Sequence, residues 1–445
     1  MTVNVIKLWD IMLQKYFQYF GEKVNHVGLR KYFKNTAWML SARVMSFLTS
    51  FLTLAMVARY LGPENLGKLD YAQSFVAIFS VLASLGIDQI LYRDLIKYPD
   101  REREIMGTAV LSKLFFGLIS LILSVSLSIY LRNETVITVL VLICALTFII
   151  SPIGTVSILF SSKVKSKYNA LLGIFLAIFI PIIKIVIVLS DKGIIFFCLT
   201  ILLEAIFSTL WYVFVYLKYF DGSIFGWRFD FSIFKILIRD SWPLLLAGFS
   251  GYVYAKIDQV LLLHYRDSFS VGIYSVAVKL TQVWAFLPGL VITSFFPAIV
   301  NARAIGIDVY RKRFRRLSGM TISLTAIIAL PLYFFAPLII SIIFGLGYID
   351  AVPILRIYLW TSLAITAVLL VQHYFIAENL SRIFLYTSVM GAVMNIILNM
   401  LLIPSYGLIG SAVATLISYI SVVISSLLFK ESRSGLIGIV CGKNR

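Results

Sequence analysis

The feature that most constrains this chain is the recurrence of continuous apolar runs, each about as long as a bilayer is thick. A transmembrane helix needs roughly 20 mostly apolar residues, so these runs predict about twelve helical spans. Barrel strands would be shorter and would alternate in polarity. The runs cover approximately residues 37–60, 70–91, 108–131, 136–160, 170–189, 194–217, 241–263, 272–300, 318–343, 353–376, 383–403 and 407–429. With 60% hydrophobic and only 13% charged residues, a soluble fold would lack polar surface. The predicted fold class is an all-α polytopic membrane protein.

Lys and Arg gather in alternate loops, and this asymmetry predicts the orientation. Short loops rich in Lys and Arg remain cytoplasmic. The basic segments include residues 1–36, the loop after the second run and the sequence VYRKRFRRL (309–317), whereas the opposite loops are short and carry few basic residues. We predict a multi-pass protein of the cell (inner or plasma) membrane with both termini cytoplasmic. Anionic lipid headgroups explain the basic clusters behind the formal charge of +18, so no nucleic-acid partner is expected.

The chain divides near residue 220 into two halves of six predicted spans. The expected organisation is a cytoplasmic N-terminal segment (1–36), an N-lobe (37–220), a cytoplasmic amphipathic linker (221–240), a C-lobe (241–429) and a cytoplasmic tail (430–445). A basic loop running into the seventh span is the alternative for the linker. Tyr60 precedes Gly67 after the first run as Tyr265 precedes Gly272 after the seventh. This internal echo is typical of transporters with parallel repeats.

Basic side chains inside the apolar runs are candidate binding residues. A charge at mid-bilayer costs about 2.5–3.5 kcal/mol on insertion scales, so it usually faces a cavity or a partner. Arg43 lies in the inner third of the first run, and Ser46 and Ser50 follow it on one helix face. Lys256 and Lys279 lie at matching depths on consecutive spans. The alternatives are snorkelling for the cations and helix packing for the serines.

Ser275 and Gln282 extend this polar surface in the second half of the chain. Lys279 shares a helix face with Ser275 and Gln282, and we expect this face to line the cavity. Lys184 also interrupts an apolar run, but its stem could reach the headgroups, so snorkelling and a cavity position remain open.

Three residues are candidates for coupling transport to an ion. Asp258 could counter Lys279 or bind a coupling ion, and Asp88 could bind an ion or be capped near the inner surface with Arg93. His373 could be a buried, hydrogen-bonded histidine or part of a proton relay. Phosphate-loop, zinc-protease and nucleophile-elbow motifs do not occur in the sequence. We therefore expect no cofactor, no metal site and no catalytic residue.

Several stretches resemble a known family. The run SARVMSFLTSFLTLAMVARYLGPENLGKLDYAQSF (41–75) is similar to the opening of polysaccharide transporters of the O-antigen type. YAKIDQVLL (254–262) and IFGLGYIDAVPILRI (343–357) are similar to parts of their second half. These transporters belong to the multidrug/oligosaccharidyl-lipid/polysaccharide flippase superfamily. The resemblance implies two six-helix lobes around a central cavity that opens alternately to each side. It also implies that basic residues hold the pyrophosphate of a lipid carrier, with Arg43 at the matching first-helix position.

The predicted function is a flippase, not an enzyme. It would translocate lipid-linked oligosaccharide repeat units of the undecaprenyl pyrophosphate type across the plasma membrane by alternating access, for cell-surface polysaccharide such as lipopolysaccharide. The expected partners are that substrate, membrane lipids and other polysaccharide-assembly membrane proteins. An exporter of drugs or small molecules is the first alternative, although a cavity for cations should be lined by acids. A membrane-embedded polysaccharide polymerase is the second, although the outer loops are short for an enzyme.

Overall fold

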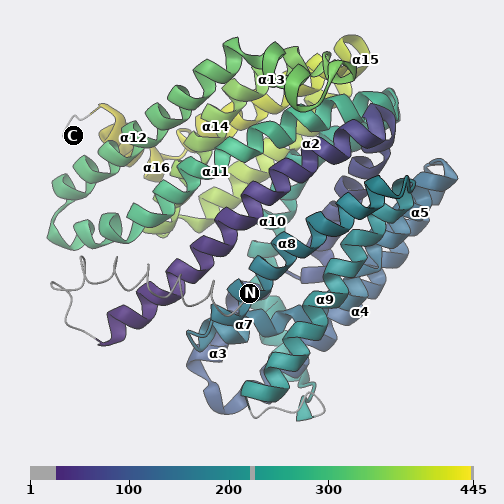
Figure 1. Ribbon diagram of the computed structural model, residues 1–445. Helices are drawn as coiled ribbons and strands as arrows, with labels where there is room; N and C mark the ends of the chain where they lie inside the picture. Colours follow the sequence, from purple (N-terminus) through teal and green to yellow (C-terminus); the bar gives the residue numbers. More distant parts are fainter. Residues whose placement is uncertain (1–26, 221–225, 442–445) are drawn as a thin grey trace.

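The computed structural model describes the backbone of residues 27–220 and 226–441. Within these ranges, the side chains of residues 27–37, 39–40, 42–44, 47–48, 381, 434 and 439–441 lie outside the description. Every regular element in the described ranges is a helix (Figure 1). Nine helical stretches of the described chain are long and apolar enough to cross a membrane. The predicted all-α membrane fold is therefore confirmed.

The helices before and after the predicted linker have the following bounds. The first set is α2 (Val27–Ser84), α3 (Asp88–Lys97), η1 (Pro99–Arg101), α4 (Glu102–Tyr130), α5 (Thr135–Ala145), α6 (Thr147–Ile150), η2 (Ser151–Thr155), α7 (Val156–Ser162), α8 (Lys167–Leu189) and α9 (Ile194–Tyr219). The second set is α10 (Phe231–Tyr265), α11 (Ser268–Ile305), α12 (Ile307–Phe334), α13 (Ala336–Ile343), η4 (Leu346–Tyr348), α14 (Ala351–Ala377), α15 (Ser381–Ser426) and α16 (Lys430–Cys441).

Two of the longest helices contain a sharp turn at a glycine. Gly62 has φ 69° and ψ 171°, and Pro63 follows it, so α2 consists of a first segment (27–61) and a second segment (63–84). Gly407 has φ 56° and ψ −131° and divides α15 in the same way. Glycine adopts a positive φ without the steric penalty of a Cβ atom, and this explains why both turns occur at glycine.

Helix α2 lies at the centre of the molecule (Figure 1). It packs against α4, α5 and α8 from the first part of the chain and against α10 and α11 from the second part. On the far side of α11, α12 and α14 pack together, and α15 packs against both α10 and α14. The contacts between the two parts of the chain are therefore made largely by α2.

At one end of the molecule, which we call the predicted outer end (residues 60–66, 131–134, 190–193, 266–267, 344–350 and 404–407), α2 and α11 touch through their backbones. A Cβ atom on Gly67 would lie 1.8 Å from the carbonyl oxygen of Ser268. A Cβ atom on Gly272 would lie 1.9 Å from the carbonyl oxygen of Pro63. The contact is reciprocal and joins the two glycines of the internal echo.

Hydrogen bonds reinforce the contact between the two parts of the chain at this end. The Arg59 guanidinium donates to the carbonyl oxygens of Ile342 and Ile343, the latter at 2.9 Å from Nε. The Tyr348 hydroxyl donates to the Ala58 carbonyl at 2.7 Å. The C-terminal carbonyls of α13 are thus satisfied by a cation from α2, which suits the negative end of a helix dipole.

At the opposite end, α10 begins inside the predicted linker and continues without a break into the seventh apolar run. Asp230 caps the helix by accepting from the backbone N–H of Ser232 (2.7 Å) and Ile233 (3.1 Å). The face of α10 that packs inward carries Ile233 and Leu237, with Phe234 and Ile238 partly buried beside them, whereas Phe231 is exposed. Ile233 and Leu237 pack in the core built from α3, α4, α7 and α9.

An ion pair ties α10 to the first part of the chain at this end. Arg93 of α3 lies 2.9 Å from Asp240 and 2.7 Å from Asp94. Hydrogen bonding from the Arg93 guanidinium lowers the pKa of the Asp240 carboxyl below its usual value.

Candidate functional site

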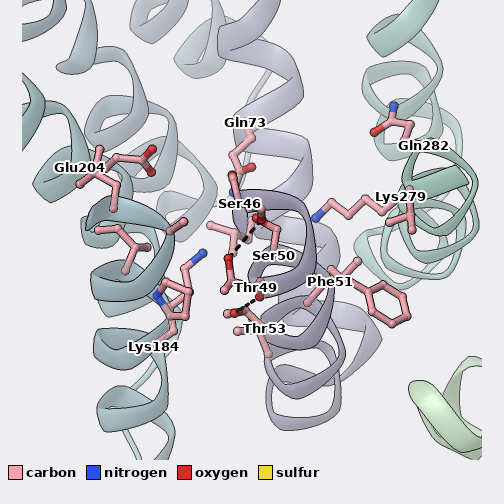
Figure 2. A pocket seen from close by; sticks show the side chains of 18 of the residues that line it. Ser46, Thr49, Ser50, Phe51, Thr53, Gln73, Lys184, Glu204, Lys279 and Gln282 are labelled. Carbon is pink, nitrogen blue, oxygen red and sulfur yellow. Dashed lines mark hydrogen bonds between the residues drawn. The ribbon is translucent and has the colours of Figure 1, made fainter. Parts of the chain in front are cut away.

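A cavity of about 670 Å³ lies between α2, α8, α9 and α11 (Figure 2). Most of its wall is apolar, as expected for helices from apolar runs. The polar side chains that line it are Ser46, Thr49, Ser50, Thr53, Gln73, Lys184, Glu204, Lys279 and Gln282. The size suits a polar headgroup of small-molecule dimensions.

The α2 wall of the cavity is a stripe of hydroxyl groups. Ser46, Thr49, Ser50 and Thr53 are spaced so that they share one helix face. Thr49 and Thr53 donate to carbonyl oxygens one turn earlier in the helix, at 2.9 and 2.6 Å. Their oxygen lone pairs remain available as acceptors. Arg43 belongs to α2, but its side chain lies outside the described residues.

Lys279 reaches the cavity from α11. Its side chain is 30% exposed and forms an ion pair with Asp70 Oδ1 on the second segment of α2. Asp70 is buried, and its Oδ2 atom has no hydrogen-bond partner among the described residues. In Figure 2 the Lys279 amine is directed towards the α2 segment that carries Ser46 and Ser50. The ion pair therefore joins the two parts of the chain at the edge of the cavity.

Asp258 is not the counter-ion of Lys279. Its buried carboxylate accepts from the Tyr274 hydroxyl at 2.6 Å, from the Tyr358 hydroxyl at 3.0 Å and from the backbone N–H of Gln259 at 2.8 Å. Its partners Tyr274 and Tyr358 lie on α11 and α14, and Asp258 is not part of the cavity wall. Two tyrosine hydroxyls and a backbone N–H thus satisfy the Asp258 carboxylate. The counter-ion of Lys279 is Asp70 instead.

Lys256 is half-buried on α10 and is not part of the cavity wall. It lies close enough to Asp70, Asp258 and Lys279 for electrostatic interaction. Within the described part of the chain, Lys256 has no hydrogen bond or ion pair. It therefore belongs to the same group of charges as Lys279 but lies outside the cavity wall.

The other candidates lie apart from the cavity. The predicted pairing of Asp88 with Arg93 is wrong: Asp88 pairs with Lys113 of α4 at 2.5 Å, because Arg93 turns towards α10. Ser275 is fully buried and its Oγ has no hydrogen-bond partner in the described ranges. His373 Nδ1 lies 2.8 Å from the Leu369 carbonyl oxygen, which is the geometry of a hydrogen-bonded histidine. Gln282, in contrast, does line the cavity.

The sequence analysis did not assign two charged residues of the cavity wall, Lys184 and Glu204, to the site. Lys184 has snorkelling as an alternative, and Glu204 is not among the residues singled out. Both are cavity-lining charges within apolar helices, on α8 and α9, which are consecutive and antiparallel. An acid and a base that interrupt two consecutive apolar runs are a signal that could have found them. No cluster of His, Cys, Asp or Glu suited to a metal occurs among the described residues.

The chain is similar in sequence to proteins of polysaccharide biosynthesis. A family model described as "Polysaccharide biosynthesis protein" matches residues 32–303. The chain is 24% identical over 416 residues to capsular polysaccharide biosynthesis protein CapF of Staphylococcus aureus, covering 89% of this chain and 98% of that protein. It is 30% identical over 172 residues to the probable flippase AglR of Haloferax volcanii, covering 37% of this chain and 35% of that protein.

Two solved structures share the overall fold. The lipid II flippase MurJ in an inward closed conformation matches with a TM-score of 0.72 and 16% sequence identity, covering 92% of this chain and 90% of that one. An inward-facing multidrug resistance MATE transporter of the MOP superfamily matches with a TM-score of 0.70 and 13% identity, covering 89% and 95%. The helical arrangement is thus that of known membrane transporters.

Proposed function

This chain belongs to the polysaccharide biosynthesis protein family, and we propose that it is a flippase for a lipid-linked oligosaccharide of the undecaprenyl pyrophosphate type. It would carry the repeat unit across the cell membrane for a cell-surface polysaccharide such as lipopolysaccharide. The family match and the similarity to proteins named as flippases support a transporter rather than an enzyme.

The observation that carries the proposal is a cation placed beside neutral hydrogen-bonding groups inside an apolar bundle. Lys279 faces the same cavity as Ser46, Ser50 and Gln282. Away from bulk water, an ammonium attracts a pyrophosphate far more strongly than it would at the surface. The hydroxyl and amide groups suit the sugar that follows. Arg43, one turn before Ser46, is a further proposed contact, and Lys256 would add positive potential from behind Lys279.

A twelve-span, two-lobe architecture is part of this proposal. The nine apolar stretches of the described chain include two that are turned sharply, at Gly62 and at Gly407. Counting each as two spans and adding the 35-residue α10 brings the number to twelve. The reciprocal contact between Gly67 and Gly272 supports two equivalent lobes, 37–220 and 241–429, joined by the linker 221–240.

Alternating access is proposed to work by opening and closing the contacts at the predicted outer end. The glycine contact and the Arg59 hydrogen bonds hold α2 against α11 and α13 there. These contacts would separate to release the headgroup outside. Asp258, Asp88 and His373 remain candidates for ion coupling. The protein would lie in the plasma or inner membrane with both termini (1–36 and 430–445) cytoplasmic, surrounded by lipid and by other polysaccharide-assembly proteins.

The test is translocation of a fluorescent lipid-linked oligosaccharide in proteoliposomes. The double variant Asp70→Asn/Lys279→Gln removes the cation without leaving a buried carboxylate unpaired, and we expect its rate to fall by about tenfold or more, the loss expected for a charge-assisted hydrogen bond. Asp70→Asn alone keeps the cation and should retain transport. Lys192→Gln, at the predicted outer surface, is the control. A double variant as fast as the control would reject the cationic cavity.

A further inference from the structure

The wall of the cavity opposite Lys279 carries two charged side chains of its own. Lys184 of α8 and Glu204 of α9 both line the space, and in Figure 2 they lie on the other side of the α2 segment from Lys279. They are close enough for electrostatic interaction. However, neither side chain forms a hydrogen bond or an ion pair with another described residue. Each therefore faces the cavity with its polar atoms free for a ligand.

The position of the two residues argues against exposure to lipid headgroups. Lys184 lies five residues before the end of α8, about 8 Å along the helix axis. Glu204 lies ten residues after the start of α9, about 15 Å from that end. A glutamate stem is too short to span this distance. Lys184 is half-buried and Glu204 is exposed, and both side chains line the cavity, so the pair is accessible to a ligand there.

Lys184 and Lys279 differ in whether a neighbouring carboxylate already neutralises the ammonium charge. Lys279 holds Asp70 in an ion pair, so an arriving anion must compete with a buried carboxylate for it. Lys184 has no such partner in the described chain. An anionic ligand entering the cavity therefore meets Lys184 as the more available cation.

We propose that Lys184 and Glu204 form a headgroup subsite for a phosphate ester attached to a hydroxylated sugar. Lys184 donates to a phosphate oxygen, and Glu204 accepts from a sugar hydroxyl, since an ionised carboxylate only accepts. This subsite rests on the proposed function and adds to it the residues that distinguish a glycosylated from a bare pyrophosphate.

The two residues predict effects of opposite sign, which a purely structural role would not produce. Lys184→Gln removes the cation and weakens binding of any lipid pyrophosphate. Glu204→Gln removes a negative charge near the phosphate, so a bare pyrophosphate binds more tightly. The same substitution replaces the charged acceptor of the sugar hydroxyl with a neutral amide oxygen, which accepts a weaker hydrogen bond, so a glycosylated pyrophosphate binds more weakly. Lys184→Arg keeps the charge and should restore most of the affinity.

The experiment measures dissociation constants of the purified full chain in detergent. The probes are geranylgeranyl pyrophosphate, undecaprenyl pyrophosphate bearing N-acetylglucosamine, and soluble UDP-N-acetylglucosamine. We expect Lys184→Gln to raise the Kd for both lipids by about tenfold or more, as for loss of a charge-assisted hydrogen bond. Lys167→Gln is the matched control, because Lys167 is exposed at the start of the same helix and lies outside the cavity wall.

Each outcome is decisive. Tight binding of the lipids without binding of the soluble nucleotide sugar identifies the lipid-linked source, and binding of the soluble probe alone transfers the subsite to free sugar nucleotides and overturns the flippase proposal. If the wild type binds none of the probes, the proposed function fails and the subsite fails with it. If the wild type binds but Lys184→Gln matches Lys167→Gln, or if Glu204→Gln shifts both lipids in the same direction, only the subsite is overturned.

Discussion

Single charged residues decide what the cavity offers to a ligand. Asp70 is buried on α2, and Lys279 is its partner across the boundary between the two parts of the chain. Breaking a buried pair leaves an uncompensated charge, which is more damaging than removing both partners. The pair is therefore both a structural contact and a limit on how freely Lys279 can bind an anion.

This pair gives a prediction for stability. Lys279→Gln strands Asp70 and should lower the free energy of unfolding by up to about 3 kcal/mol, the lower end for a broken buried pair, since Lys279 is partly exposed. Asp70→Asn/Lys279→Gln should recover part of this loss. Thermal unfolding in detergent measures both. A double variant less stable than Lys279→Gln alone would contradict the assignment.

A second residue-scale prediction concerns pH. The pKa of Asp240 is lowered by Arg93, so the pair stabilises the protein above the usual carboxyl pKa and loses this effect as the pH falls below about 4. The pair is partly exposed, so its contribution is about 0.2–1 kcal/mol. The Tm of Asp240→Asn should lie below that of wild type at pH 6, and the gap should close towards pH 3. An unchanged gap at pH 3 would rule out this linkage.

At the scale of helices, the α2–α11 contact is the feature with the least tolerance for change. Gly67 and Gly272 each place backbone where a Cβ would need to be. Small residues let transmembrane helices approach this closely. The contact also lies where the sequence shows its internal echo, so a pattern in the sequence corresponds to one interface.

We expect Gly67→Ala or Gly272→Ala to separate these helices, with an overpacking cost of about 1–3 kcal/mol. The readout is Tm in detergent together with transport rate. Gly289→Ala is the matched control on α11, because a Cβ there meets nothing within 4 Å. Equal Tm values for Gly272→Ala and Gly289→Ala would disprove a tight contact.

The apolar runs predicted helices well but not their breaks. The fourth run is divided by η2 at Pro152, and the second run (70–91) is broken by a turn at residues 85–87, after which α3 begins. Proline removes a backbone donor, yet in transmembrane helices its effect depends on what repairs the lost bond. Hydropathy alone does not contain that information.

At the scale of the whole molecule, the distribution of Lys and Arg predicts which end faces the cytoplasm. In a chain with Cys144, Cys198 and Cys441 replaced by alanine, Lys192→Cys should react with an impermeant maleimide on intact cells. Lys312→Cys should react only after the cells are opened, since the basic loop is predicted to lie inside. Labelling of both positions on intact cells would overturn the predicted topology.

The sequence by itself determined that the chain is a helical membrane protein, because the hydrophobicity needed to cross a bilayer is a local property of each run. The family resemblance was also confirmed, because such a resemblance depends on the sequence alone. Only the tertiary structure decided which charges meet. Each residue turns a helix by about 100°, so small differences in rotation and the turn at Gly62 determine the partners. Lys279 thus pairs with Asp70 rather than Asp258, and Lys184 and Glu204 line the same cavity without forming an ion pair.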